Sequence, residues 1–311
     1  MTIDRKNLRI VFMGTPEFAV PSLSILLEHG YDIPAVITAP DAYGGRGGKV
    51  LIQSAVKLFA LSKGIPVLQP EKLRNPDFLK TLKEINGDVF VVVAFRMLPE
   101  VVWNMPKYGT FNLHGSLLPK YRGAAPIHHA IMNGEVKTGV TTFKLKHEID
   151  TGDFVFQESL PIGPEDNVGT IHDKMMELGA KVMLKTISAL KDGNLHFVPQ
   201  RDEDASHAPK LSLENTKIDF NKNAKQIHDF IRGLSPFPTA WMYLDEKITK
   251  IYEANFIIKE DHFNPGHIIY NGVNSMQIKC KDGYINILKL KMDGKKQMDI
   301  RTFLMGYRPQ K

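Results

Sequence analysis

Apolar runs and helical patterns alternate along the first two thirds of the chain. The runs 8–14, 33–40 and 88–95 are short and rich in aliphatic residues, as expected of strands that are buried on both faces. Between them lie segments with helical spacing, such as 21–30, which starts at a proline and closes with Gly30. Strand and helix repeated in this order predict a doubly wound, mostly parallel α/β sheet.

The last third of the chain follows a different pattern. A long amphipathic helix is predicted over 168–193, and a polar segment with little periodicity comes after it. Short strand-like runs separated by Gly, Asn and Asp then predict a small β-barrel or sandwich. We therefore expect an α/β domain over 1–194, a linker over 195–212 and a small β domain over 213–311.

One strand-like run carries two polar side chains at its end. Residues 111–119, FNLHGSLLP, alternate apolar and polar residues and then break the pattern at a glycine. Side chains on a strand alternate between faces, so Phe111 and Leu113 are expected on one side, with Asn112 and His114 together on the other. Ligands of open α/β sheets bind at the carboxyl ends of the strands, which makes this pair a candidate site.

A histidine that carries out acid–base chemistry needs a partner that holds its tautomer and its transient charge, most often a carboxylate. The segment 148–153, EIDTGD, offers Asp150 and Asp153 in a tight turn between two predicted strands. A turn can direct one carboxylate inward while the other binds the backbone. The pattern alone does not decide between the two aspartates.

The turn after the first strand argues against a nicotinamide enzyme. Residues 14–22, GTPEFAVPS, occupy the place of a dinucleotide fingerprint but do not form G-x-G-x-x-G, because Pro16 and Glu17 occupy the turn, and an acid there would oppose a pyrophosphate. The oxidoreductase interpretation, which is natural for this fold class, thereby loses its main support.

Composition narrows the class of protein further. The 311 residues include one cysteine, Cys280, which excludes an internal disulfide framework and a zinc cluster built from cysteines. The longest apolar run, 89–95, is far too short to cross a bilayer. We expect a soluble cytoplasmic protein.

The net charge of +6 lies entirely in the C-terminal third. Residues 1–209 contain 23 basic and 23 acidic side chains, whereas residues 210–311 contain 17 basic and 11 acidic ones. A solvated lysine-rich face is the usual explanation of such a run. The asymmetry still favours a polyanionic partner, and nucleic acid before a membrane.

Several of these motifs together resemble those of the folate-dependent formyltransferases. NLHGSLLPKYRGAAPI followed by DTGD is highly specific, and the branch that acts on methionyl-tRNA also shares GTPEFAVPSL, PDAYGGRGGK and IRGLSPFPTAW. The resemblance covers nearly the whole chain. It implies a Rossmann-like catalytic domain, a C-terminal OB-fold-like barrel that binds tRNA, and formyl transfer from 10-formyltetrahydrofolate to the amino group of methionyl initiator tRNA.

The resemblance also implies roles for particular residues. The catalytic set is Asn112, His114 and Asp150, and no metal is needed because the formyl donor is already activated. The folate-contacting residues are Ser116, Leu117, Leu118 and Pro119, together with Arg96, Met97 and Leu98. At 95–96 the family has Tyr-Gly where this chain has Phe-Arg, so contacts there would run through the backbone. The RNA contacts are Arg46 and Lys49 in a glycine-rich loop that we expect to stay mobile until its partner binds.

Two alternatives remain open at this point. A formyltransferase that acts on a sugar-nucleotide or ribonucleotide amine would share the catalytic set but would not require the basic loop or the basic barrel. A non-catalytic RNA-binding protein would explain the C-terminal charge but not the Asn/His/Asp set. We expect the protein to be a monomer and to act without a membrane.

Overall fold

The computed structural model describes residues 8–44, 48–270 and 273–307. The chain forms two compact units that interleave along the sequence. The first unit comprises Met1–Arg122, Gly139–Leu160 and Asp173–His207, and the second comprises Gly123–Thr138, Pro161–His172 and Ala208–Lys311. The contiguous boundaries drawn from the sequence, at 194/195 and 212/213, stay a prediction.

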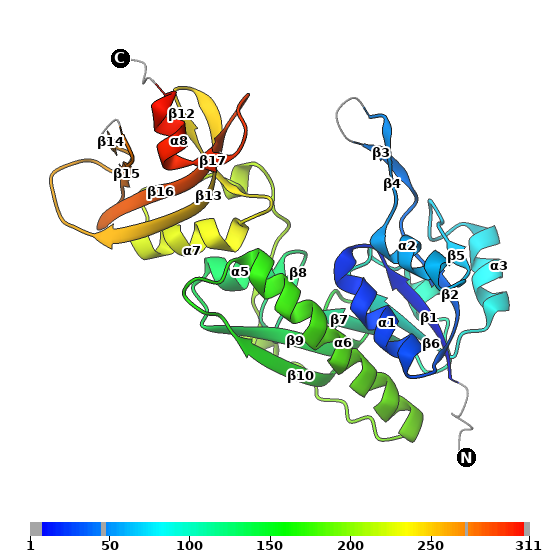
Figure 1. Ribbon diagram of the computed structural model, residues 1–311. Helices are drawn as coiled ribbons and strands as arrows, with labels where there is room; N and C mark the ends of the chain where they lie inside the picture. The colour runs from blue at the N-terminus through cyan, green and yellow to red at the C-terminus, as the bar shows by residue number, and fades with distance from the viewer. Residues whose placement is uncertain (1–7, 45–47, 271–272, 308–311) are drawn as a thin grey trace. The chain divides into compact units, whose positions relative to one another are not determined.

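A seven-stranded sheet forms the centre of the first unit, in the order β10-β9-β7-β6-β1-β2-β5 (Figure 1). The pairs β1–β2, β1–β6, β2–β5 and β6–β7 are parallel, whereas β9 runs antiparallel to β7. The strands are β1 (Arg9–Gly14), β2 (Asp32–Ile37), β5 (Val67–Leu68), β6 (Val89–Val93), β7 (Thr110–His114), β9 (Lys137–Lys144) and β10 (Phe154–Pro161).

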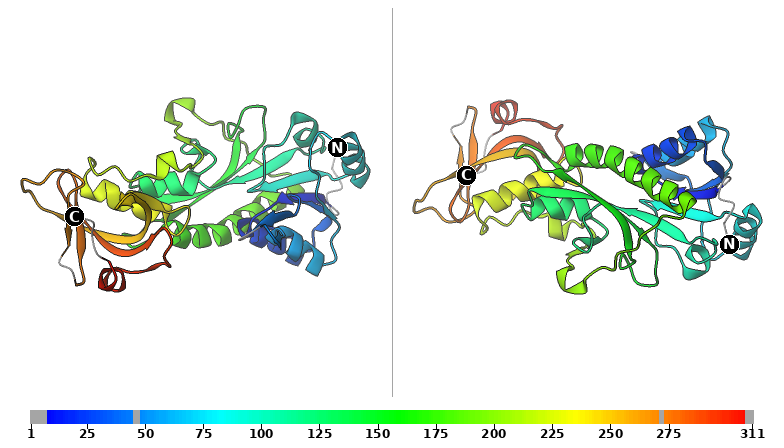
Figure 2. Two further views of the ribbon diagram at one scale, coloured as in Figure 1. Left: turned by 90° about the horizontal axis from the view of Figure 1, so that it is seen from above. Right: turned by 90° about the horizontal axis from the view of Figure 1, so that it is seen from below.

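Helices cover both faces of this sheet, which explains why its central strands β1 and β6 are almost wholly apolar. Val11 and Met13 of β1 pack with Phe78 of α3 in one core cluster. On the other face α6 crosses β7 (Figures 1 and 2), so closely that a Cβ on Gly179 would lie 2.6 Å from Leu113 Cδ2. The helical segments are η1 (Glu17–Ala19), α1 (Val20–Glu28), α2 (Ala55–Ser62), α3 (Pro76–Ile85), α4 (Glu100–Trp103), α6 (Val168–Asp192) and η2 (Asp202–Asp204).

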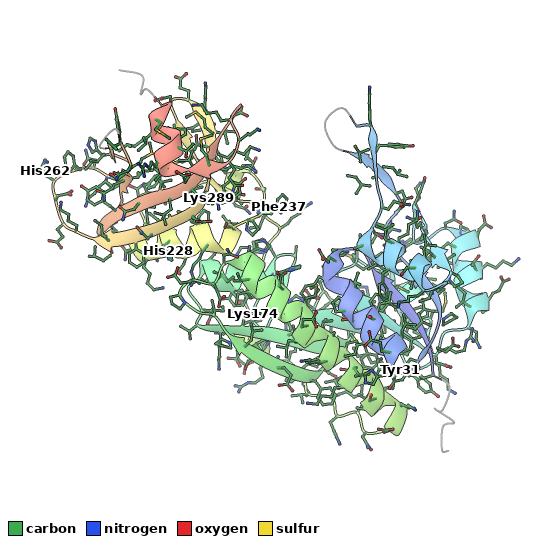
Figure 3. The ribbon with its side chains drawn as sticks, viewed as in Figure 1. Tyr31, Lys174, His228, Phe237, His262 and Lys289 are labelled. Atoms are coloured by element: carbon green, nitrogen blue, oxygen red, sulfur yellow. The ribbon has the colours of Figure 1, made fainter. Side chains whose placement is uncertain are left out.

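The end of α1 is joined to α6 by a hydrogen bond. The Tyr31 hydroxyl lies 3.0 Å from the Ser188 hydroxyl, and Figure 3 shows Tyr31 beside these helices. A separate two-stranded sheet pairs β8 (Arg122–Gly123) with β11 (His207–Ala208).

The glycine-rich loop after β2 is flanked by a β-hairpin that the sequence patterns did not predict. Strands β3 (Ala42–Gly44) and β4 (Val50–Ile52) pair antiparallel and form a two-stranded ribbon (Figure 1). Both strands are short and mostly exposed, so they show no alternation of apolar and polar residues from which they could be predicted. The residues on both sides of the loop, 42–44 and 50–52, therefore form regular structure, so the expected mobility does not apply to them.

The second unit contains an antiparallel sheet in the order β12-β13-β16-β15-β14, with β17 paired to β16. The sheet confirms the small β domain expected from the short C-terminal runs. Its strands are β12 (Ala240–Leu244), β13 (Lys247–Ile258), β14 (Ile268–Tyr270), β15 (Met276–Lys279), β16 (Gly283–Met292) and β17 (Met298–Asp299). Its helical segments are α5 (Pro126–Met132), η3 (Glu214–Thr216), α7 (Ala224–Leu234) and α8 (Ile300–Met305).

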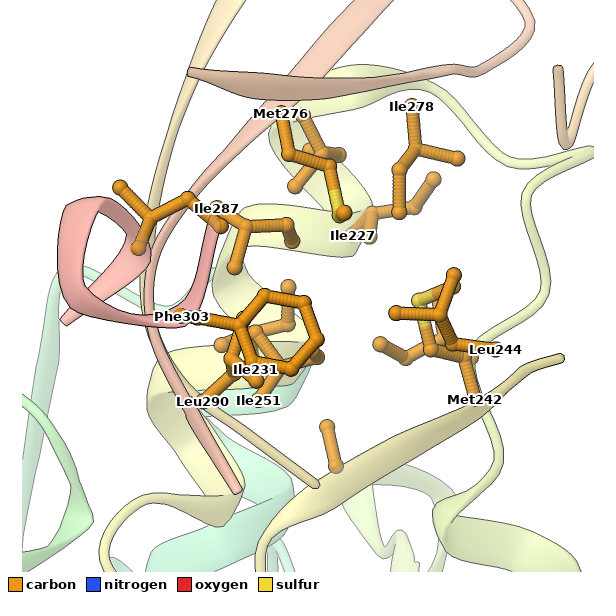
Figure 4. Packing of buried hydrophobic residues seen from close by; sticks show 14 of the residues in the cluster. Ile227, Ile231, Met242, Leu244, Ile251, Met276, Ile278, Ile287, Leu290 and Phe303 are labelled. Carbon is orange, nitrogen blue, oxygen red and sulfur yellow. The ribbon is translucent and has the colours of Figure 1, made fainter. Parts of the chain in front are cut away.

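Inward-facing residues of this sheet pack against α7 and α8 in one apolar core (Figure 4). Ile227 and Ile231 of α7 lie on one helical face because they are four residues apart. They meet Ile287 and Leu290 of β16 and Phe303 of α8, all of which are almost fully buried. The fold class expected from the sequence, a doubly wound α/β sheet with a small β domain, is thus confirmed.

Candidate active site

Strand β7 ends at His114, at the carboxyl edge of the parallel part of the sheet. Phe111 and Leu113 are 0% and 4% exposed, whereas Asn112 is half-buried. By strand alternation Asn112 and His114 share the opposite face of β7. The structure thus places both polar residues at the strand end where the sequence predicted a site.

Both ring nitrogens of His114 face an oxygen atom. Nε2 lies 2.8 Å from the Tyr121 carbonyl oxygen, and because a carbonyl only accepts, Nε2 carries the proton of that bond. Nδ1 lies 3.8 Å from Asp150 Oδ2, which is too long for a hydrogen bond. The backbone therefore holds the imidazole through Nε2, and Nδ1 faces the carboxylate.

The turn between β9 and β10 directs Asp150, and not Asp153, toward His114. The Asp150 side chain is only 12% exposed, whereas Asp153 accepts a 2.7 Å hydrogen bond from Lys146 at an exposed position. Asp150 has a φ of 55°, a left-handed conformation that aspartate tolerates better than most residues. The contacts therefore distinguish the two aspartates, between which the sequence pattern did not decide: Asp150 faces His114, and Asp153 pairs with Lys146.

Gly152 explains why the turn can be this tight. A Cβ at position 152 would lie 1.8 Å from the Lys144 carbonyl oxygen, so no larger residue fits without moving the backbone. The close approach of two backbone segments thus requires the glycine of the Asp-Thr-Gly-Asp motif.

The loop Ser116–Pro119 is held by side chains of β9 and β10. The Thr141 hydroxyl donates to the Ser116 carbonyl at 2.6 Å and accepts from the Leu118 N–H at 3.1 Å. The Gln157 amide donates to the Leu118 carbonyl at 2.6 Å. Leu117 lies between these anchored residues and is partly exposed, and the peptide bond that precedes Pro119 is cis.

Thr141 and Gln157 were not expected from the sequence patterns. The available signal for Thr141 was a pair of threonines between Val140 and Phe143, because a buried hydroxyl needs a hydrogen-bond partner. The partner itself could not be known without the fold.

The three residues expected after β6 have different environments. The Arg96 guanidinium donates to the carbonyl oxygens of Pro70 and Glu71, the latter at 2.9 Å. Met97 is 73% exposed, whereas Leu98 is 8% exposed and belongs to the core beneath α3. Their proposed role toward folate stays a prediction.

Of the two residues expected to bind RNA, Arg46 lies outside the described residues, and Lys49 is exposed directly before β4. Asp41 links the residues on either side of the β3–β4 hairpin by hydrogen bonds. Asp41 Oδ2 lies 2.5 Å from Lys57 Nζ and 3.2 Å from Gln53 Nε2, and Asp41 Oδ1 accepts from Gln69 Nε2 at 2.7 Å. This one carboxylate links the start and end of the hairpin to α2 and to the end of β5.

The hydrogen bond from Lys57, with that from Gln69, lowers the pKa of Asp41 to about 2. A lowered pKa in the folded state means that folding favours the ionised form. The stabilisation is complete above the ordinary aspartate pKa of about 3.9 and disappears as the pH falls through about 2.

Asp41→Asn is therefore expected to lower the urea midpoint of unfolding at pH 6, and to lower it by less at pH 3. Asp32→Asn is the matched control, because Asp32 pairs with Arg9 in an exposed salt bridge and such pairs contribute little. A difference between Asp41→Asn and the native chain that stays constant or grows toward pH 3 would contradict the role assigned to the Asp41 carboxylate.

Among the described residues, no group of three or more His, Cys, Asp or Glu side chains is arranged to hold a metal ion. Among the helices in the described part of the chain, none is long and apolar enough to span a membrane.

Comparison with known proteins agrees with the geometry of the site. Residues 8–187 match the formyl transferase family, and residues 210–308 match the formyl transferase C-terminal domain family. The methionyl-tRNA formyltransferase of Bacteroides fragilis is 46% identical over 312 residues, which covers 97% of this chain and 96% of that protein. That of Parabacteroides distasonis is 49% identical over 314 residues and covers 98% and 97%.

Solved structures with lower identity share the fold. A sugar 3N-formyl transferase, WlaRD, solved with dTDP and 5-N-formyl-THF, has a TM-score of 0.67 at 23% identity and covers 93% of this chain and 99% of its own. HypX from Aquifex aeolicus, solved with tetrahydrofolic acid, has a TM-score of 0.65 at 18% identity and covers 96% and 47%. With both domain families matched and close relatives aligned over nearly their full length, the chain belongs to the methionyl-tRNA formyltransferase family.

Proposed function

We propose that this formyltransferase moves the formyl group of 10-formyltetrahydrofolate to the free amino group of methionyl initiator tRNA. The observation that carries the proposal is the meeting of His114 and Asp150 at the end of β7, beside Asn112, in a chain of this family. The relatives bear the name of this reaction over nearly their full length.

The chemistry requires two things of the site. The amine nitrogen bonds to the formyl carbon and the carbonyl electron pair moves to oxygen. The tetrahedral species then re-forms the carbonyl as its bond to the folate nitrogen breaks, and that nitrogen takes up the proton that the amine has lost. A donor must stabilise the oxyanion, and a base must remove a proton from the attacking nitrogen. The Asn112 amide supplies the hydrogen-bond donor for the oxyanion. His114 Nδ1, next to Asp150, is the nitrogen left for the reacting groups because Nε2 is bound to Tyr121.

Asp150 stabilises the charged imidazole that forms when His114 takes the proton. The distance of 3.8 Å between Asp150 Oδ2 and His114 Nδ1 also leaves room for a small shift or a bridging group. The loop 116–119, held by Thr141 and Gln157, would then border the folate site at the same strand end.

The second unit offers a surface that suits RNA. Tyr243 is 52% exposed, and the Lys217 ammonium lies 5.0 Å from its ring centroid. Lys250 and Lys291 are directly opposite each other on β13 and β16. Like charges in such a position repel, so a polyanion that lies across them would stabilise the pair.

The lysines continue along the same sheet. Lys289 of β16, labelled in Figure 3, pairs with Glu253 at 2.9 Å. We propose that this lysine-bearing face contacts tRNA phosphates. We also propose that the protein acts as a monomer in the cytoplasm, where its tRNA substrate is found.

The β3–β4 hairpin is the second proposed RNA contact. Arg46→Ala combined with Lys49→Ala is expected to raise the KM for methionyl-tRNA roughly tenfold and to reduce its salt dependence, because each lysine or arginine on a phosphate releases a counterion. The KM for the folate should stay within twofold. Lys63→Ala is the matched control, since Lys63 is an exposed lysine at the end of α2. An equal rise in both KM values would refute this division of roles.

One assay tests the function as a whole. The protein is incubated with 10-formyltetrahydrofolate and, in separate reactions, charged methionyl initiator tRNA, a dTDP-linked amino sugar and a ribonucleotide amine. We expect formylation of the tRNA alone. Transfer to the sugar or the ribonucleotide amine would favour the alternative acceptors, and tRNA binding with no transfer to any acceptor would favour a non-catalytic RNA-binding protein.

A further inference from the structure

The segment 200–206, which the sequence assigns to a linker, contacts the turn that carries Asp150 and the backbone that binds His114. At one end Gln200 binds the turn that carries Asp150. At the other end Ser206 binds the backbone that holds His114. All of these residues belong to the first unit.

Gln200 uses every hydrogen-bonding position of its side chain. Its amide nitrogen donates to the carbonyl oxygens of Asp150 at 2.8 Å and Gly152 at 2.7 Å. Its oxygen accepts from Arg122 Nε at 3.1 Å and from Arg122 Nη2 at 2.8 Å. A primary amide has two N–H groups and two lone pairs, so the side chain is saturated and has one orientation that satisfies all four bonds.

Arg122 in turn holds the Gln200 side chain in place. Arg122 is 8% exposed, and two N–H groups of its guanidinium converge on the amide oxygen of Gln200 and hold it in place. Its Nη2 also donates to Asp202 at 2.9 Å, but the Asp202 side chain is 83% exposed. Solvent weakens that last bond, so Gln200 is the principal partner of Arg122.

The other end of the segment positions the histidine. The Ser206 hydroxyl accepts from the Tyr121 N–H at 2.9 Å, and the Ser206 carbonyl accepts from the Arg122 N–H at 2.9 Å. The Tyr121 carbonyl is the acceptor for His114 Nε2. Arg122 therefore connects the backbone that orients the imidazole with the side chain that holds the Asp150 turn.

The turn needs such support. Asp150 has a left-handed φ of 55°, which costs free energy in a residue other than glycine, and the preceding Glu148 and Ile149 are exposed. Gln200 binds the turn on both sides of Thr151, through the carbonyls of residues 150 and 152. The contacts thereby hold the backbone that carries the Asp150 carboxylate.

We propose that Gln200, held by Arg122, is a positioning residue that sets the distance between the Asp150 carboxylate and the His114 imidazole during formyl transfer. The inference rests on the proposed function and deepens it. Gln200 touches no reacting atom, and it acts on the rate only through Asp150.

The first test replaces Gln200 with methionine, which has a similar length but no hydrogen-bonding amide. We expect kcat to fall by about 10- to 100-fold, because a shift of about 1 Å in a catalytic group costs on this order. The KM values for methionyl-tRNA and for the folate should stay within twofold. Asp202→Asn is the matched control, since Asp202 also contacts Arg122, and it should retain kcat within twofold.

A double-mutant cycle separates positioning from a general effect on the fold. In an Asp150→Asn background, Gln200→Met should lower kcat by less than threefold, because the carboxylate that it positions is already gone. Multiplicative effects of the two substitutions, or an unchanged kcat for Gln200→Met alone, would overturn the proposal.

Gln200→Glu keeps the inference testable if Gln200→Met fails to fold. The glutamate still accepts from Arg122 but cannot donate to the two carbonyl oxygens, so the segment stays anchored while the turn is released. A cooperative thermal transition would show that the variant is folded, and we expect the same fall in kcat; a folded variant with native kcat would overturn the proposal. The native chain is assayed first, so its inactivity with methionyl-tRNA would count against the proposed function and not against Gln200.

Discussion

Replacing His114 with alanine is expected to abolish measurable formyl transfer, with kcat lower by about 10³-fold, because proton transfer and transition-state stabilisation are lost together. The substitution also removes the donor to the Tyr121 carbonyl. That hydrogen bond contributes about 1 kcal/mol to the free energy of unfolding, so the variant should remain folded. Single-turnover rates with saturating folate and methionyl-tRNA measure the effect.

The affinity of the His114→Ala variant for tRNA should be close to that of the native chain, since the proposed RNA contacts lie elsewhere. His147→Ala serves as the control, because His147 is exposed near the Asp150 turn and has no assigned role. A turnover within tenfold of the native value for His114→Ala would remove the histidine from the proposed mechanism.

The second large effect is expected for Asp150→Asn, which keeps the size of the side chain and removes its charge. We expect kcat to fall by roughly 10²–10³-fold, since an imidazole without its carboxylate loses both orientation and stabilisation of its charged form. The buried position of Asp150, with a side chain 12% exposed, makes this charge effective because solvent screens it little. Rates at saturating concentrations of both substrates report on this step.

Asp153→Asn is the matched control for Asp150→Asn, because both aspartates belong to one turn and only Asp150 faces the imidazole. Asp153 pairs with Lys146, whose side chain is 53% exposed, and such pairs contribute little. We expect its kcat to stay within about threefold of the native value. If the two substitutions had equal effects, the turn as a whole would matter and the assignment of Asp150 would be wrong.

The sequence by itself determined the fold class and the position of one part of the site. Continuous aliphatic runs are stable only where both faces of a strand are covered, so the alternation of such runs with helices predicted the doubly wound sheet. The alternation in 111–114, followed by a glycine, likewise placed Asn112 and His114 at a strand end. These inferences succeed because they depend on periodicity, which is a local property of the chain.

The tertiary structure decided which distant groups meet. Asp150 and Asp153 are two ends of one short motif, and only the approach of the turn to β7 distinguishes the aspartate that faces His114. The contacts of Gln200 to the same turn span 48 and 50 positions in the sequence and lie in a segment without periodicity. Hydrogen bonds between residues so far apart leave no repeating pattern, because their partners are set by how the strands and turns pack and not by neighbouring residues.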